Sequence, residues 1–262
     1  MEKHRIIAEH ATRANTRDLK KPNEDKIIAD EENGIYILLD GITRPHGEYE
    51  QSPYQSAACR VNEVFADAVY RRLLARGTEE SVRQALRSAV ELGNAAIADY
   101  RGVKTEEEWQ FYPATLGIIA VTEGDKLCYY CAGDCLGVLL RGSSRLLFGR
   151  QQVLEAVDML GVTKKERYGL YCNKPRNKLS YAVFNGDSVA AEGGECSFIT
   201  LYPGDTVLLA SDGIAGYLKY ERVDVLRASS TAEMLDASTE YDRPPFAKYA
   251  DDKSVIKLDV LP

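Results

Sequence analysis

Two apolar segments of the sequence end in the same pair of residues, aspartate followed by glycine. The segment 35–41 reads IYILLDG, and the segment 205–213 reads DTVLLASDG. A buried strand would hold each carboxylate rigidly, and the glycine would allow a sharp turn and the close approach of a ligand to the main chain. Further acidic residues border other strand-like segments, at Asn23-Glu24-Asp25, Gly133-Asp134 and Asp251-Asp252.

Carboxylates gathered at one end of a sheet would repel one another and would need cations between them. A donor set made only of oxygen favours Mg²⁺ or Mn²⁺ over zinc. Two such ions about 4 Å apart can activate a shared water and hold a phosphoryl group. The alternative is that each Asp-Gly pair is an ordinary turn after a strand. Composition alone does not show that these loops lie side by side, so this alternative stays open.

The composition is that of a globular protein. The chain has 262 residues, of which 45% are hydrophobic and 28% charged, which is enough for a sizeable core. The net charge of −7 is a poor match for nucleic acid or an anionic membrane, and no apolar run is long enough for a membrane helix. The charged N-terminus lacks the apolar region of a signal peptide. We therefore expect a cytoplasmic protein with no nucleic-acid or membrane partner; the oligomeric state stays open.

The elements that must position the acidic residues read as strands, two long helices, more strands, short helices and a last strand. Apolar spacing predicts helices over 52–74 and 78–100, with Ser52-Pro53 at the start of the first. Two antiparallel sheets covered by helices satisfy this order, so we expect one α+β domain over 1–262. Strands are expected at 3–8, 26–29, 35–39, 115–121, 126–132, 137–140, 198–201, 206–210 and 254–260, and short helices at 151–159, 213–218, 221–226 and 232–238.

Cys128 and Cys131 form a CxxC pair, and Cys135 follows. This spacing could indicate a zinc or redox site. The run lies in an expected strand, however, where residues three apart point to opposite faces. No second CxxC and no nearby histidine completes a zinc site. We therefore interpret these residues as reduced core and turn cysteines.

The order of the acidic motifs resembles that of the metal-dependent protein phosphatases of the PPM, or type 2C, family. The most specific segment is GDTVLLASDGIAGYL, which begins at Gly204. Because further segments follow the family order, the resemblance covers nearly the whole chain. They are NED (23–25), LLDG (38–41), ATLGIIAV (114–121), AGDC (132–135), NKPRNKLS (173–180) and ADDKS (250–254).

The resemblance implies a bacterial-type single domain, built as a four-layer αββα sandwich with two Mn²⁺ or Mg²⁺ ions between the sheets. By motif position, Asp40 would bridge the two ions and the Gly41 carbonyl would bind one of them. Asp212 and Asp251 would bind the other, and a metal-bridging hydroxide would attack phosphorus directly. Asp40 and Asp212 are therefore the expected catalytic residues. Asp25 would act in the metal shell.

Two more acidic residues have implied roles at the same centre. Glu24 could share the role of its neighbour Asp25. Asp134 matches the aspartate that, together with Asp212, holds a third metal in some members of the family. The implied activity is that of a protein serine/threonine phosphatase.

Candidate contacts to the substrate phosphate depart from the family pattern. The turn after Asp40 contains Arg44, and Lys20 and Lys21 stand where the family carries an arginine before NED. Residues 164–194 fall where the family carries its flap. The implied substrate is a phosphorylated protein. The alternatives are a phosphatase of a small phosphorylated metabolite, and a regulatory or binding module of the same fold with weak or no activity.

Overall fold

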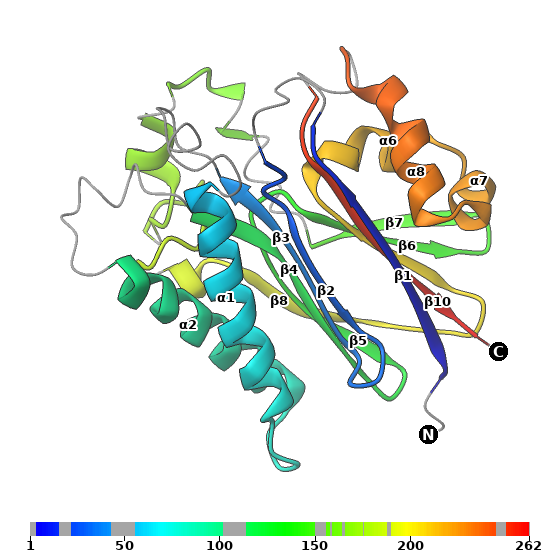
Figure 1. Ribbon diagram of the computed structural model, residues 1–262, viewed down its shortest axis with the longest axis horizontal. Coiled ribbons are helices and arrows are strands. Elements are labelled where there is room, and N and C mark those ends of the chain that lie inside the picture. The colour runs from blue at the N-terminus through cyan, green and yellow to red at the C-terminus, as the bar shows by residue number, and fades with distance from the viewer. Residues whose placement is uncertain are drawn as a thin grey trace.

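The computed structural model describes residues 4–15, 22–42, 56–101, 114–149, 156–157, 159–163, 166–174, 176–187, 190–244 and 250–261. These segments form four layers in the order helices, sheet, sheet, helices (Figure 1). Both sheets are antiparallel throughout the described part of the chain. The α+β sandwich that the sequence predicts is confirmed.

Each sheet in the described part of the chain has five strands, and the two sheets differ in how they use the sequence. The first sheet joins the two ends of the chain, because its first and last strands in sequence pair side by side. In order across this sheet, the strands are β1 (Ile6–Arg13), β10 (Lys253–Val260), β9 (Thr206–Ala210), β6 (Leu136–Arg141) and β7 (Ser144–Phe148). Those of the second sheet are β2 (Lys26–Asp30), β3 (Ile35–Ile42), β4 (Ala114–Glu123), β5 (Lys126–Ala132) and β8 (Glu195–Thr200).

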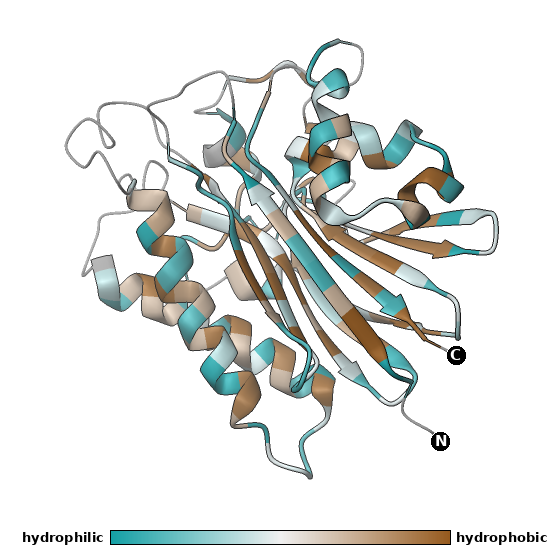
Figure 2. Ribbon diagram, turned by 45° about the vertical axis from the view of Figure 1, so that its right-hand side comes forward, coloured by the Kyte–Doolittle hydropathy of each residue, from teal (hydrophilic) through white to brown (hydrophobic). Residues whose placement is uncertain are grey.

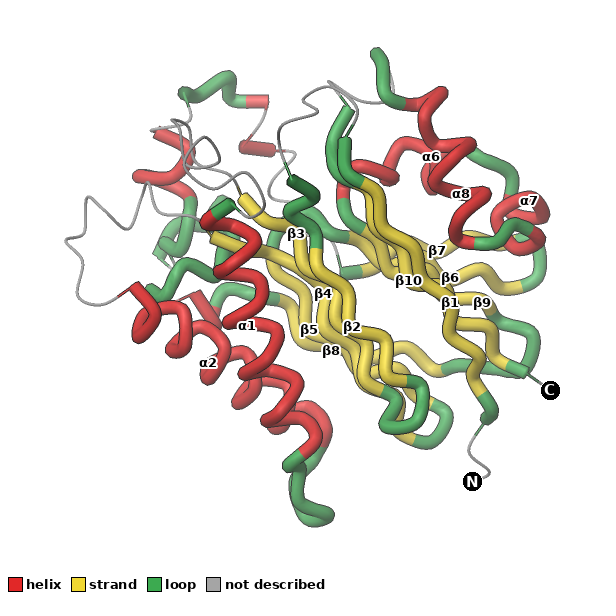
Figure 3. The backbone as a smooth tube through the Cα atoms, in the orientation of Figure 1, coloured by secondary structure: helices red, strands yellow, loops and turns green. Residues whose placement is uncertain are grey.

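Two long helices cover the second sheet, and three short helices cover the first (Figure 3). Ser56 caps the first long helix, with its hydroxyl accepting a hydrogen bond from the Cys59 amide. The expected Ser52-Pro53 start lies outside the described residues. The long helices are α1 (Ala57–Leu74) and α2 (Val82–Arg101), and the short ones are α6 (Ala215–Tyr220), α7 (Val223–Ala228) and α8 (Thr231–Ala237).

Three apolar layers hold the sandwich together, and Figure 2 shows apolar residues running along the strands. The first layer packs α1 and α2 on the second sheet, where the rings of Phe65 and Phe184 stack 4.5 Å apart. The second lies between the sheets and includes Leu38 and Leu209. The third packs the short helices on the first sheet and includes Tyr217. Residues 35–39 of β3 and 207–210 of β9 are buried on both faces of their sheets, and both segments are continuous apolar runs.

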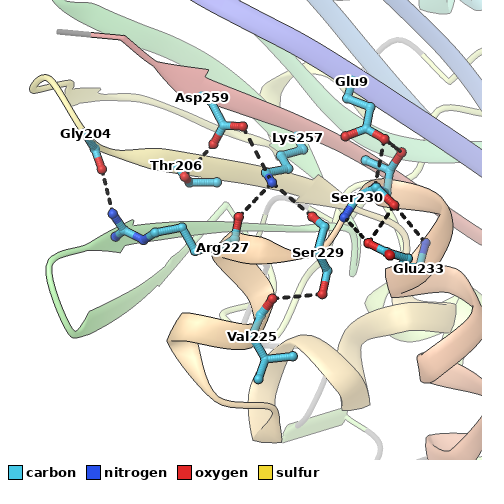
Figure 4. A network of polar contacts seen from close by, with 11 residues as sticks. Glu9, Gly204, Thr206, Val225, Arg227, Ser229, Ser230, Glu233, Lys257 and Asp259 are labelled. Carbon is cyan, nitrogen blue, oxygen red and sulfur yellow. Dashed lines mark hydrogen bonds and ion pairs between the residues drawn. The ribbon is translucent and has the colours of Figure 1, made fainter.

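A polar network ties the short helices to the first sheet (Figure 4). The buried Lys257 of β10 donates hydrogen bonds to the carbonyls of Arg227 (2.9 Å) and Ser229 (3.0 Å), just where α7 ends. Glu9 of β1 accepts from both the amide and the hydroxyl of Thr231, at the start of α8. The lysine satisfies carbonyl groups that the helix end leaves open.

The structure adds features that the sequence did not indicate. The strand β7 was not predicted, and β1 runs five residues beyond the expected end, from Ala8 to Arg13. Within 164–194, the described residues contain a π-helical turn at Arg167–Tyr171 and a bridge from Phe184 to Thr115. None of the helices in the described segments is long and apolar enough to span a bilayer.

Candidate metal centre

Strand pairing in the second sheet places two acidic residues side by side. The β2–β3 register sets Lys26 opposite Leu39, so Asp25 and Asp40, the next residue on each strand, lie at the same end of the pair. β3 continues through Asp40 to Ile42, which keeps this carboxylate on a regular strand. The Thr115 hydroxyl also donates to the Asp40 carbonyl at 3.2 Å. Asp40 is therefore held by its strand and not by a loose loop.

The first sheet brings its acidic residues to this end as well. Ala210, the last residue of β9, pairs with both Val255 of β10 and Leu136 of β6. The chain positions just beyond these residues are the loops that carry Asp212, Asp251 and Asp134. Antiparallel pairing thus collects motifs that are more than 200 residues apart in sequence at one end of the sandwich.

Three of the collected carboxylates lie close together. Asp40, Asp134 and Asp212 each offer one oxygen, and these oxygens all lie within 4.8 Å of one another. All three residues are partly buried. The trio draws one residue from β3 of the second sheet, one from the β5–β6 turn and one from the 3₁₀ turn that follows β9. It therefore spans the space between the two sheets.

The electrostatics of Asp40 reflect this crowding. Burial raises the pKa of Asp40 well above its ordinary value, and the charges of four neighbouring carboxylates raise the pKa further. The largest of these charge effects comes from Asp25, followed by Asp212, Asp134 and Asp251. In the absence of a cation, the ionised form of Asp40 is therefore disfavoured.

Asp25 shows the same effect. Burial, helped by the charges of Asp252 and Asp251, raises its pKa to about 7, while hydrogen bonds from Ser254 and Ser211 act in the opposite direction. The Ser211 hydroxyl donates to Asp25 Oδ2 at 2.8 Å. The other oxygen, Oδ1, is buried and has no hydrogen-bond partner among the described residues.

Glu24 is held by hydrogen bonds to its side chain, its carbonyl and its amide. Its carboxylate accepts from the Ser56 hydroxyl, its carbonyl accepts from Asn62 Nδ2, and its amide donates to Asp252 Oδ2 at 2.9 Å. The residue is 1% exposed. The bond to Ser56 engages only one carboxylate oxygen, Oε1, so it leaves the carboxylate compatible with a place in the metal shell.

The two Asp-Gly glycines are needed for close packing. A Cβ at Gly41 would lie 2.6 Å from the Glu24 carbonyl oxygen, and a Cβ at Gly213 would lie 1.9 Å from the Asp252 carbonyl oxygen. The expected sharp turn at Gly41 is wrong, because β3 runs on to Ile42 and neither glycine has a positive φ. In both places the glycine lets another acidic loop come against the backbone.

Some of the expected site residues are not placed by the structure. Arg44, Lys20 and Lys21 lie outside the described residues. Sequence reasoning also missed Ser211, whose hydroxyl accepts from the Ser254 amide at 2.9 Å while it donates to Asp25. The signal for it was its place directly before Asp212, at the end of an apolar strand.

The cysteines are structural, as the sequence indicates. All six are free. Cys128 packs with the core under the long helices, and Cys131 packs in the core between the sheets, so the CxxC pair does face opposite sides of β5. Burial raises the pKa of the Cys131 thiol well above its ordinary value, which keeps it protonated and unreactive.

The residues at the acidic end fit a divalent cation. Asp40, Asp134 and Asp212 supply only oxygen donors, which is the chemistry that Mn²⁺ and Mg²⁺ prefer. Burial and then the charges of the neighbouring carboxylates raise the pKa of Asp40, and a bound cation would relieve this repulsion between the carboxylates. The buried Oδ1 of Asp25 adds an acceptor with no hydrogen-bond donor from the described part of the chain.

No protein-family model and no curated protein matches this sequence. Solved structures do match. The serine/threonine phosphatase PstP/Ppp of Mycobacterium tuberculosis is 20% identical with a TM-score of 0.67, over 98% of this chain and 99% of that chain. The catalytic domain of PstP in complex with two manganese ions is 20% identical with a TM-score of 0.64, over 98% of this chain and 100% of that chain. The PPM Ser-Thr phosphatase MsPP of Mycobacterium smegmatis is 16% identical with a TM-score of 0.60, over 97% of this chain and 98% of that chain. The chain therefore shares its fold with these proteins along nearly its whole length.

Proposed function

We propose that this chain is a metal-dependent phosphatase of the PPM family, which hydrolyses phosphate monoesters on serine and threonine side chains of proteins. The observation that carries the proposal is the trio of Asp40, Asp134 and Asp212, whose oxygens lie within 4.8 Å of one another. It occurs in a fold shared with serine/threonine phosphatases, one of which is in complex with two manganese ions. The sequence motifs occur in the family's order.

Asp40 is the proposed bridge between two Mn²⁺ or Mg²⁺ ions, because four other carboxylates surround it. Asp212 and Asp251 would complete one ion's shell, and the carbonyl of Gly41 would contribute to the other. Asp134 lies within reach of both Asp40 and Asp212, which supports its place at a third ion.

Divalent cations held there would lower the pKa of a water molecule and neutralise charge that develops on the phosphoryl group. The chain's own residues orient the centre. Ser211 holds Asp25 through Oδ2, and Thr115 holds the backbone of Asp40. Glu24, bound to Ser56, would support Asp25 in the outer shell.

The proposed phosphate contacts are chosen by the charge of their side chains and by their positions in the sequence. Arg44, Lys20 and Lys21 are the proposed phosphate contacts, since a cationic side chain beside the acidic end would bind the anionic ester. Residues 164–194 are the proposed flap in a single domain over 1–262. Phe184 of this segment forms a bridge with Thr115, which pairs with Gly41 at the end of β3. The bridge therefore attaches the segment beside the end of β3.

Hydrolysis assays test the proposal. Purified protein would be given p-nitrophenyl phosphate with Mn²⁺, with Mg²⁺ and with EDTA, and then phosphoserine and phosphothreonine peptides against small phosphorylated metabolites. We expect metal-dependent turnover that is abolished by EDTA, and a preference for the peptides. A protein that binds Mn²⁺ but hydrolyses none of these esters would instead be a binding module, and faster turnover of a metabolite would overturn the protein-phosphatase assignment.

A further inference from the structure

Asp252 follows the proposed metal ligand Asp251 directly, but its carboxylate binds the N-terminal part of the chain. Oδ1 accepts from the amide of Asn15 at 2.7 Å and from its Nδ2 at 3.0 Å, and Oδ2 accepts from the amide of Glu24 at 2.9 Å. The residue is 3% exposed. Hydrogen bonds to an ionised acceptor are stronger than those between neutral groups.

These contacts join the two sheets at the acidic end. Asn15 lies two residues after β1, which belongs to the first sheet, and Glu24 lies two residues before β2, which belongs to the second. Asp252 itself precedes β10 of the first sheet. One buried carboxylate therefore fixes both ends of the β1–β2 connection against the start of the last strand.

Glu24 passes this restraint to the metal centre. Its amide is held by Asp252, and its carbonyl is the atom against which Gly41 packs. The next residue is Asp25, whose charge acts on Asp40 more than that of any other carboxylate. A shift of Glu24 would therefore displace both the Gly41 backbone and the Asp25 side chain.

We propose that Asp252 is a positioning residue of the metal centre: by clamping Asn15 and Glu24, it holds Asp25 and the Gly41 carbonyl in register with Asp40. The inference rests on the proposed function, because it assumes that this end of the sandwich binds Mn²⁺. Residues that orient metal ligands from the outer shell typically change metal affinity by about 10- to 100-fold when they are replaced.

The chain offers a matched control in Asp205. This residue is also 3% exposed, and its carboxylate accepts from Arg141 (2.9 and 2.6 Å) and from the amide of Tyr202 (2.8 Å). It lies just before β9, at the opposite end of that strand from Asp212. Replacing Asp205 would remove three hydrogen bonds to a buried carboxylate without touching the acidic end.

The test compares the wild type with Asp252→Ala, Asp252→Asn and Asp205→Ala. Mn²⁺ affinity would be measured by calorimetry, stability by urea unfolding, and backbone order by amide hydrogen exchange at Glu24. We expect both alanine variants to lose stability, but only Asp252→Ala to bind Mn²⁺ about tenfold or more weakly and to lose protection at Glu24. Asp252→Asn should show Mn²⁺ affinity and Glu24 protection between those of the wild type and Asp252→Ala, because an amide cannot accept all three hydrogen bonds.

The outcomes separate the inference from the proposed function. Wild-type Mn²⁺ affinity in both Asp252 variants would overturn the positioning role. So would a loss of Mn²⁺ affinity in Asp205→Ala as large as that in Asp252→Ala. Either outcome would leave the phosphatase assignment intact. A wild-type protein that binds no Mn²⁺ would overturn the proposed function itself. Should Asp252→Ala fail to fold, Asp252→Asn decides through its Mn²⁺ affinity and its hydrogen exchange at Glu24.

Discussion

Asp25 lies beside Asp40 at the paired ends of β2 and β3. Among the neighbouring carboxylates, Asp25 is the one whose charge raises the pKa of Asp40 most. Both residues are fixed by strand pairing, so neither can move away to relieve the repulsion. Two carboxylates held in this way favour either a bound proton or a bound cation. Backbone register thus gathers, at one end of the sandwich, the carboxylates that the proposed cation site requires.

Removing one of these charges should stabilise the metal-free protein. In EDTA, Asp40→Asn is expected to raise the free energy of unfolding by about 1 kcal/mol or more, because burial and like charges disfavour the ionised form. The same variant should lose the stabilisation that Mn²⁺ gives the wild type. Urea unfolding with and without Mn²⁺ measures both effects. Asp236→Asn, an exposed control paired with Arg13, should change neither.

The stability of the metal-free protein should fall as the pH rises towards 7. Asp25 has a folded-state pKa of about 7 against an ordinary value of 3.8, so between these values the folded state binds a proton that the unfolded state lacks. The raised pKa of Asp40 acts in the same direction. Urea unfolding in EDTA should therefore give higher stability at pH 5.5 than at pH 7.5. Equal or rising stability across this range would contradict the burial of these carboxylates.

Mn²⁺ binding should show the opposite dependence on pH. The ion requires ionised carboxylates, so its binding must release protons from Asp25 and Asp40 at neutral pH and below. Calorimetry in two buffers with different ionisation enthalpies counts these protons. We expect proton release on binding and an affinity that increases from pH 6 to pH 8. Binding without proton release would show that the metal does not use these groups.

A methyl group at either Asp-Gly glycine should damage the centre. Gly41→Ala and Gly213→Ala would press a Cβ against the carbonyls of Glu24 and Asp252, at 2.6 and 1.9 Å. We expect a loss of about 1–3 kcal/mol of stability from such overpacking, together with weaker Mn²⁺ binding. Gly77→Ala is the control, because a Cβ there would meet nothing within 4 Å. Wild-type stability in Gly213→Ala would show that the two loops do not come so close.

The network around Lys257 should matter for stability alone. Lys257→Met would leave the carbonyls of Arg227 and Ser229 without their ammonium donor, at a cost of about 1–3 kcal/mol. Mn²⁺ affinity should stay at the wild-type value, since none of these groups belongs to the acidic end. Lys178→Met is the control at an exposed position, and its urea midpoint should equal that of the wild type within experimental error.

Much of the fold could be predicted because its strands are unambiguous in sequence. The segments 35–39 and 207–210 are continuous apolar runs, which is what a strand covered on both faces requires. The missed β7, SRLLF, exposes two leucines and lies at a sheet edge, so it shows neither a buried run nor a clean alternation. In the described residues Ser56 caps α1, a role that sequence reasoning had given to the Ser52-Pro53 pair, which lies outside those residues.

The candidate site was only partly visible in the sequence. Asp40 and Asp212 stand out because each terminates an apolar run. The contacts of Asp252 with Asn15 and Glu24 join residues more than 200 positions apart, and no local pattern encodes them. The purpose of Gly41 was also hidden, because a glycine required by a close neighbour looks the same in sequence as a glycine required by a turn.

The most direct test of the account is a Mn²⁺ titration of the wild type and Asp40→Asn in which binding and p-nitrophenyl phosphate turnover are followed on the same samples. We expect the wild type to bind two ions with turnover that rises with their occupancy, and Asp40→Asn to lose both binding and turnover. Turnover that persists in EDTA, or wild-type turnover in Asp40→Asn, would contradict a metal centre built on Asp40.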